Sequence, residues 1–293
     1  MTDTTKFNNR FMIAGVQMPV PLGKSNVGLM QAEVARTMSL FPGVEMIVFS
    51  ELCAHGPLFA DMAEDPGADE AAFQELASRF GIWLVPGSFF VRRDNEIYNQ
   101  AIVIAPDGKI VGRYDKLFPF RPFEAGVAGG ADFLVFDVPQ VGRFGLSICY
   151  DIWFPEVMRT LSSMGVEVLL HPVLTGTTDR DAELAIVRAT AAMFQCYVVD
   201  VNGLEAGGVG LSLVADPAGR VAYQAGQTKE AFPIVLDLGL VRQARASGAN
   251  GLGQVLKSWR DRRVSFDVYK DGTATDYLAG LGPLQPMARR QFS

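Results

Sequence analysis

Three residues of chemically complementary types follow three apolar, strand-like runs of this chain. Glu51 comes directly after the run 45–50, Lys116 follows the run 109–114, and Cys149 follows the run 143–148. A nucleophilic cysteine needs a base for its thiol proton, donors for a negatively charged oxygen and an acid for the leaving group. A carboxylate and an ammonium group beside the sulfur would meet these needs. We therefore predict that these three side chains converge on one site.

The position of Cys149 favours a nucleophile. The apolar run ends at Cys149, and Pro155 then opens a predicted helix. A side chain at such an elbow is held rigidly, close to backbone N–H groups that can receive negative charge. A free cysteine is more often a small buried hydrophobe. The presence of Glu51 and Lys116 after other strands favours the reactive interpretation.

These residues lie in motifs that resemble those of the nitrilase superfamily of carbon–nitrogen hydrolases, in its amidase-like branch. The nucleophile motif is Cys149-Tyr-Asp-Ile-Trp-Phe-Pro-Glu, the glutamate motif is Phe-Ser-Glu51-Leu-Cys-Ala-His-Gly, and the lysine motif is Gly-Arg-Tyr-Asp-Lys116-Leu-Phe. They occur in the family's order, over roughly residues 11–238. The resemblance implies hydrolysis of a small-molecule amide through a thioester acyl-enzyme, without a metal or an organic cofactor.

The resemblance also implies a second glutamate that lies between the lysine and the cysteine and orients the lysine. Glu124 is the best candidate by position. Glu156 is better interpreted as a carboxylate in the first turn of a helix, where the helix dipole favours it. We expect Lys116 to lower the thiol pKa of Cys149 and, with the backbone N–H of Tyr150, to hold the oxyanion.

The residues around the nucleophile bear on the substrate. Tyr150-Asp151 resembles the amidase branches, whereas true nitrilases resemble Cys-Trp-Glu. Trp153 stands where omega-amidase-like members usually have arginine, and N-carbamoylputrescine hydrolases also have tryptophan there. Amide hydrolysis is favoured, and N-carbamoyl amide hydrolysis or nitrile hydrolysis remain alternatives.

An aromatic entrance is predicted around the site. Phe118 replaces a histidine that is common in the family, and Phe120, Phe123, Tyr150 and Trp153 add to it. An apolar or small aliphatic amide is therefore the preferred substrate, with Tyr150, Trp153, Phe118 and His171 as candidate substrate-binding residues. The aromatic residues are equally consistent with loop and core packing. Arg121 or Arg180 would suit an acidic substrate group.

Two other functions remain open. A Cys149–His171 dyad of the cysteine-protease type would replace the Glu–Lys chemistry, because His171 also follows a predicted strand. A non-catalytic interaction module of the same fold is the alternative from another class. Such a module has no need of Glu51, Lys116 and Cys149 together.

Composition favours a cytoplasmic protein that acts on a small molecule. The 293 residues are 49% apolar and carry a net charge of −6. The basic residues are scattered, which indicates neither a nucleic-acid nor a membrane surface. Three cysteines fit neither a disulfide framework nor a Cys-x-x-Cys metal site. The N-terminus has no apolar signal core, and no run approaches a membrane span.

Strands and helices alternate along the chain, with hairpins inserted, which predicts mixed sheets covered by helices. The resemblance implies a four-layer αββα sandwich and a homodimer or larger assembly. We predict one domain over residues 1–293, with 239–293 as a C-terminal extension that packs at a subunit interface. The predicted strands are 11–17, 45–50, 83–91, 97–105, 109–114, 133–138, 143–148, 166–170, 197–201, 209–215, 220–224 and 232–238. The predicted helices are 24–40, 69–80, 155–164 and 182–195.

Overall fold

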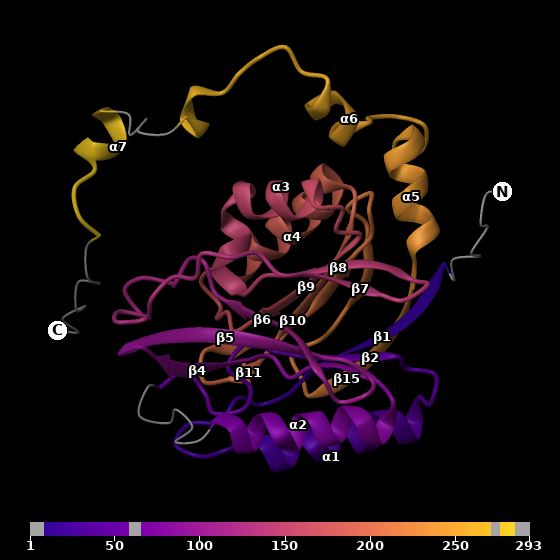
Figure 1. The fold of residues 1–293 in the computed structure, drawn as a ribbon, viewed down its shortest axis with the longest axis vertical. Coiled ribbons are helices and arrows are strands. Elements are labelled where there is room, and N and C mark those ends of the chain that lie inside the picture. Colours follow the sequence, from indigo (N-terminus) through magenta and orange to yellow (C-terminus); the bar gives the residue numbers. More distant parts are fainter. Residues whose placement is uncertain (1–8, 59–65, 271–275, 285–293) are drawn as a thin grey trace.

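Two mixed β-sheets packed face to face form the centre of the molecule (Figure 1). The computed structural model describes residues 9–58, 66–270 and 276–284. In the first sheet the strand order is β15-β1-β2-β3-β5-β4, with β6 paired to β5. β1, β2 and β3 are parallel, and the other pairs are antiparallel. Its strands are β1 (Arg10–Gln17), β2 (Met46–Phe49), β3 (Trp83–Val85), β4 (Ser88–Arg93), β5 (Glu96–Ile104), β6 (Ile110–Asp115) and β15 (Glu230–Asp237).

The second sheet has the order β14-β13-β10-β9-β8-β7. Its central strands β8, β9 and β10 are parallel to one another. A separate two-stranded ribbon of β11 (Leu204–Glu205) and β12 (Gly208–Val209) comes between β10 and β13 in the chain. The strands of the sheet are β7 (Val135–Val138), β8 (Gly142–Leu146), β9 (Val168–Val173), β10 (Tyr197–Asn202), β13 (Leu213–Ala215) and β14 (Val221–Gln224).

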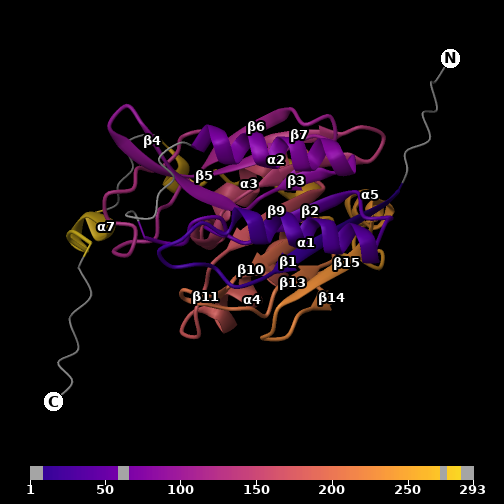
Figure 2. The same cartoon turned by 90° about the horizontal axis from the view of Figure 1, so that it is seen from below.

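Helices cover the outer face of each sheet, which confirms the four-layer αββα sandwich. α1 (Val27–Leu40) and α2 (Pro66–Phe80) lie side by side across the first sheet, as Figure 2 shows. α3 (Pro155–Ser163) and α4 (Arg180–Phe194) cover the second sheet. Because each helix is apolar along one stripe, it can bury that stripe against a sheet and leave its other side to solvent.

Each interface between layers has its own hydrophobic core. The core between the sheets includes Phe11, Val48 and Phe144. A second core joins the first sheet to α1 and α2, and a third joins the second sheet to α3 and α4. Fully burying a side chain of this size stabilises the fold by about 1.5–3 kcal/mol. The near-continuous apolar strands follow from this arrangement, because both faces of each central strand are covered.

Most of the predicted elements are present, and three predictions were wrong in detail. The strand predicted over 83–91 is two strands, because Pro86 lacks an N–H and Gly87 has a φ of +77°. Val209 belongs to the β11–β12 ribbon and not to the hairpin that β13 and β14 form. The strand predicted to end before His171 continues through Pro172, which pairs in register with Val201 of β10.

The chain beyond β15 begins inside the core and then leaves it. α5 (Leu238–Ser247) buries Leu238, Val241 and Ala244. α6 (Val255–Arg260), a 3₁₀ turn (Asp267–Tyr269) and α7 (Asp276–Gly280) then follow an outer path past α3 (Figure 1). Among the described residues, no helix has the length and apolarity that crossing a membrane requires.

Gly87 supports the strand end that carries Glu51. A Cβ atom at Gly87 would lie 1.9 Å from the carbonyl oxygen of Ser50, the residue before Glu51. We expect Gly87→Ala to lower the free energy of unfolding by about 3 kcal/mol, through left-handed strain and this clash. Gly81→Ala is the matched control, because Gly81 also has a positive φ but has open space around it. We expect it to lose about 1 kcal/mol. Urea unfolding measures both, and equal losses would contradict the role given to the Ser50 contact.

Candidate active site

Glu51, Lys116 and Cys149 meet at one end of the sandwich, where β2, β6 and β8 end. Lys116 follows β6 directly, and its Nζ donates to Glu51 Oε1 over 2.8 Å. The thiol of Cys149 lies close enough to the Glu51 carboxylate to act as a donor to it, which opposes the rise of the Glu51 pKa. The Glu51 backbone N–H donates to the carbonyl of Val173 at the end of β9, over 3.2 Å. Glu51 is thereby fixed to both sheets at once.

Glu124 completes a buried cluster around the lysine. Lys116 Nζ donates to Glu124 Oε2 over 2.7 Å. The ammonium group therefore lies between two carboxylates, and only 1% of Lys116 is exposed. Glu156 instead lies exposed in the first turn of α3, as predicted.

Asn99 is a site residue that sequence reasoning missed. Its Nδ2 donates to Glu51 Oε1 over 2.8 Å and to Glu124 Oε1 over 2.9 Å. The backbone carbonyl of Asn99 accepts from the backbone N–H of Lys116 over 2.9 Å. Asparagine is disfavoured within strands, so its presence in β5 was the signal in the sequence that could have indicated a site residue.

The electrostatics of the site favour a protonated thiol at rest. Burial raises the pKa of Cys149 well above its usual value, and the charge of Glu51 raises it further. Lys116 acts in the opposite direction and lowers the thiol pKa, as predicted, but burial and the charge of Glu51 outweigh it.

Burial also raises the pKa of Glu51, with the charge of Glu124 adding to it and Lys116 opposing it. Lys116 loses hydration as well, yet its pKa is raised well above the usual value by Glu51, Cys149 and Glu124. The lysine therefore stays charged while the carboxylate beside it is a stronger base than an exposed glutamate.

The backbone at Cys149 forms the predicted elbow. Cys149 has a φ of +47° and begins a 3₁₀ helix, η2 (Cys149–Trp153). Asp151 fixes it, with Oδ2 accepting from the Ile148 N–H over 2.9 Å and from the Tyr114 hydroxyl over 2.7 Å. Its Oδ1 accepts from the Phe118 N–H over 2.8 Å. Cys149 is thus held by the loop after Lys116.

Aromatic side chains gather beside η2. Tyr150 lies 5.0 Å from Phe120 and 6.1 Å from Trp153, measured between ring centroids. Phe123 lies 5.5 Å from Phe120 and is 64% exposed. Phe118 differs, because it stacks on Phe154 at 3.6 Å within the core under α3 and α4. For Phe118, the structure favours the packing alternative.

His171 lies within β9 and not beyond its end. Its Nδ1 hydrogen-bonds with the hydroxyl of Ser147 over 2.8 Å. It shares a face with Leu169, two residues earlier, which packs in the core under α3 and α4. Burial lowers the pKa of His171 to about 4. The alternative of a Cys149–His171 dyad assumed that His171 follows a strand, and that premise was wrong.

The two arginines considered for an acidic substrate have internal partners. Arg121 donates to the carbonyls of Glu124 and Val127 over 2.6 and 2.7 Å, which ties its own loop together. Arg180 is 1% exposed and pairs with Glu183 and Asp200.

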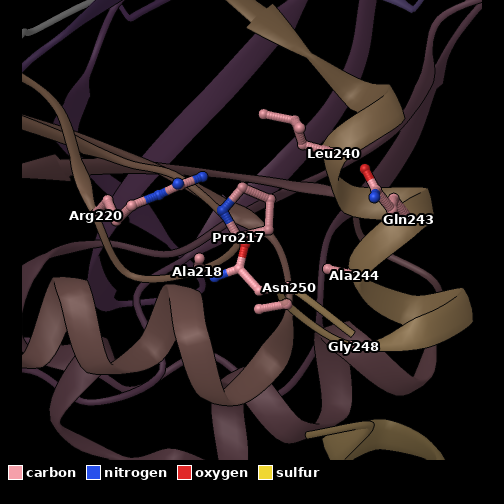
Figure 3. A pocket seen from close by; sticks show the side chains of 9 residues that line it. Pro217, Ala218, Arg220, Leu240, Gln243, Ala244, Gly248 and Asn250 are labelled. Carbon is pink, nitrogen blue, oxygen red and sulfur yellow. The ribbon is translucent and has the colours of Figure 1, made fainter. Parts of the chain in front are cut away.

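A surface pocket lies between the β13–β14 turn and α5 (Figure 3). None of Glu51, Lys116 and Cys149 lines it. Arg220 at its edge pairs with Asp216 over 2.7 Å. Its lining holds no carboxylate or thiol and consists of Pro217, Ala218, Arg220, Leu240, Gln243, Ala244, Gly248, Ala249 and Asn250. Within residues 9–58, 66–270 and 276–284, no group of three His, Cys, Asp or Glu side chains is placed to hold a metal ion.

The chain resembles known proteins over most of its length. A family model described as carbon-nitrogen hydrolase matches residues 12–246. A nitrilase of Pyrococcus abyssi is 28% identical over 270 residues, which cover 87% of this chain and 98% of the relative. A formamidase of Helicobacter acinonychis is 29% identical over 209 residues, which cover 66% of this chain and 62% of the relative. The match therefore spans less than two thirds of that formamidase.

Solved structures share the fold. A carbon-nitrogen hydrolase from Helicobacter pylori G27 superimposes with a TM-score of 0.78 at 23% identity, over 89% of this chain and 99% of its own. An amidase from Nesterenkonia sp. gives a TM-score of 0.72 at 21% identity, over 85% of this chain and 96% of the amidase.

Removing the central cation tests the electrostatics. In Lys116→Met, Glu51 and Glu124 stay buried without a counter-ion, so we expect the free energy of unfolding to fall by about 3–5 kcal/mol near pH 8. Burial has already raised the pKa of Glu51, so its folded-state carboxylate gains a proton as the pH falls. The loss should therefore shrink near pH 5, since a raised folded pKa favours the folded state at low pH.

Urea unfolding at the two pH values measures this difference. Lys109→Met is the control, because Lys109 pairs with Asp107 on the surface and its loss should leave stability unchanged at both pH values. An equal loss for Lys116→Met at both pH values would contradict the buried-charge explanation.

Proposed function

The chain belongs to the carbon–nitrogen hydrolase family, and on this premise we propose that it hydrolyses a small-molecule amide with Cys149 as the nucleophile. The observation that supports this most is the buried contact of the Cys149 thiol with the Glu51 carboxylate, beside the Lys116 ammonium group. A formamidase and an amidase among the similar proteins are consistent with amide chemistry.

In the first step, Cys149 Sγ attacks the amide carbon while Glu51 takes the thiol proton. The raised pKa of Glu51 suits it to this transfer, and the protonated resting thiol means that the proton moves only when the substrate is attacked. The carbonyl oxygen becomes an oxyanion. Lys116 and the backbone N–H of Tyr150, which lies in the first turn of η2, are the donors proposed to hold it.

In the second step, Glu51 gives its proton to the leaving nitrogen, and the C–N bond breaks to release ammonia or an amine. The acyl group remains on Cys149 as a thioester. Glu51 then takes a proton from water, the resulting hydroxide attacks the thioester, and the acid product leaves as the thiol regains its proton. Lys116 keeps its charge throughout, because its pKa is raised. It acts by charge and not as a base.

The substrate proposed is an uncharged apolar or small aliphatic amide. Tyr150, Trp153, Phe120 and Phe123 form an aromatic surface beside the nucleophile. Arg180 and Arg121, the two cations considered for a carboxylate, are bonded within the protein. A substrate carboxylate would also meet the negative charges of Glu51 and Glu124.

Mass spectrometry and ammonia release test the reaction. We expect wild type to release ammonia from neutral aliphatic amides and to form an acyl adduct on Cys149 that is absent from Cys149→Ala. An omega-amide that carries a carboxylate should give a kcat/KM at least about tenfold lower, because Arg121 and Arg180 are already bonded within the protein. Cys53→Ala is the matched control, since Cys53 is fully buried in the core under α1 and α2.

The outcome also decides between the alternatives. Turnover of N-carbamoyl compounds or nitriles, but not of amides, would replace the amide by those substrates. No adduct and no ammonia from any of these compounds would support the non-catalytic module instead.

We further propose that two copies associate through the C-terminal segment. Beyond α5 this segment touches α3 through Arg159, whose guanidinium lies 3.9 Å from the ring centroid of Trp259. Its apolar side chains are otherwise largely exposed, which a monomer rarely tolerates in one segment. They include Leu252, Val264, Phe266, Val268, Tyr277, Leu281 and Leu284. A second copy would cover them.

Charged substitutions in this segment test the assembly. We expect wild type to be dimeric or larger by light scattering, and Val264→Asp/Val268→Asp to be a folded monomer, because burying two aspartates at an interface is unfavourable. Leu29→Asp is the control, as Leu29 is 57% exposed on α1 at the opposite face. A monomeric wild type, or a double variant that assembles as wild type does, would contradict the proposal.

A further inference from the structure

A second buried group of charges lies beside the nucleophile and has no part in the proposed reaction. Arg180 Nη1 donates to Glu183 Oε2 over 2.6 Å and to Asp200 Oδ2 over 3.2 Å. Arg180 Nη2 donates to Asp200 Oδ1 and to the carbonyl of Leu211. Asp200 alone therefore meets both terminal nitrogens of the guanidinium. A further buried carboxylate is unfavourable unless it has its own partners.

Thr175 connects Glu183 to Cys149. Its Oγ1 lies 3.7 Å from Cys149 Sγ, and the same hydroxyl is close enough to the Glu183 carboxylate to act as a donor that lowers the pKa of Glu183. The Asn202 side chain holds the Thr175 backbone from both sides, accepting from its N–H over 2.9 Å and donating to its carbonyl over 3.0 Å. The hydroxyl is therefore fixed between a carboxylate and the sulfur.

From these contacts we infer that Thr175 is a further catalytic residue, whose hydroxyl donates to the Cys149 sulfur as the thiolate forms. Glu183 is a positioning residue that sets the direction of this hydroxyl. The inference rests on Cys149 being the nucleophile, as proposed above.

The direction in which the Thr175 hydroxyl donates depends on whether the Glu183 carboxyl carries a proton. When Glu183 is ionised it accepts the Thr175 proton, and the Thr175 oxygen can then only accept from the thiol, in competition with Glu51. When Glu183 is neutral, its O–H can donate a hydrogen bond to the Thr175 oxygen. The Thr175 hydroxyl is then free to donate its own hydrogen bond to the sulfur. The thiol proton then has Glu51 as its acceptor, and the thiolate gains a donor. No proton is gained or lost by Thr175 in either arrangement.

The surroundings allow both states of Glu183 near neutral pH. Burial and the charge of Asp200 on β10 together raise the pKa of Glu183 to about 7, against the opposing charge of Arg180. Cys149 on η2 is also close enough for the Glu183 charge to raise the thiol pKa. His171 on β9 lies opposite Asp200 in the sheet register, and burial keeps it neutral.

Glu183→Gln imitates the neutral carboxyl, because its amide oxygen accepts from Arg180 and its NH₂ donates to Thr175. The probe is iodoacetamide, and the readout is the alkylation rate of Cys149 by mass spectrometry between about pH 6 and pH 9. This readout needs no amide substrate, so its failure is distinct from failure of the proposed hydrolysis.

We expect Glu183→Gln to speed alkylation about tenfold above pH 7 and to have little effect below about pH 6, where wild-type Glu183 is itself protonated. In the Thr175→Val background, Glu183→Gln should speed alkylation of Cys149 about threefold or less, because only the loss of the Glu183 charge remains. In the Thr175→Ser background the full effect should return.

Turnover gives a second readout. Thr175→Val should lower kcat about tenfold with little change in KM, and Thr175→Ser should restore most of it. Thr177→Val is the matched control, since Thr177 lies exposed in the same loop. The inference is overturned if Glu183→Gln acts equally in the Thr175 and Thr175→Val backgrounds, or if Thr175→Ser and Thr175→Val behave alike. Circular dichroism checks that every variant is folded.

Discussion

A buried ammonium group held between two carboxylates is the interaction on which the rest of this structure depends. Lys116 has lost nearly all contact with water, and an isolated charge in that position would be strongly unfavourable. Glu51 and Glu124 compensate it, and Asn99 joins the two carboxylates through one amide. Each of these groups is acceptable only because the others are present. The cluster therefore demands a scaffold that brings distant segments together accurately.

The sandwich meets this demand through its sheet edges. Glu51 follows a central strand of the first sheet, and Cys149 follows a strand of the second. The hydrogen bond from Glu51 to Val173 joins the sheets where Glu51 and Cys149 meet. The hydrophobic core between the sheets sets their spacing, so the packing of residues such as Phe11 and Phe144 also determines the distance between Glu51 and Cys149.

How far the sequence could predict this arrangement depended on whether a residue stood out from its local pattern. Glu51, Lys116 and Cys149 each follow an apolar run, so their positions at strand ends were visible. Thr175 was not, because its role comes from a neighbour far along the chain, and Asn99 stood out only as an asparagine within a strand. His171 was misplaced, because the proline after it suggested the end of a strand that in fact continues. For Phe118, residue type alone could not distinguish a pocket wall from core packing, and only its stacking on Phe154 does.

The protonated state of Cys149 has a consequence for the survival of the protein under oxidative conditions. Peroxides attack the thiolate, and a sulfur that keeps its proton reacts slowly with them. Burial raises the pKa of Cys53 and Cys196 to about 12, so the thiols of all three cysteines are protonated at rest. In the proposed reaction, the Cys149 thiolate forms only during turnover, when the substrate itself occupies the sulfur. The same desolvation that would delay the proposed attack until a substrate arrives would thus protect Cys149 from irreversible oxidation in the resting protein.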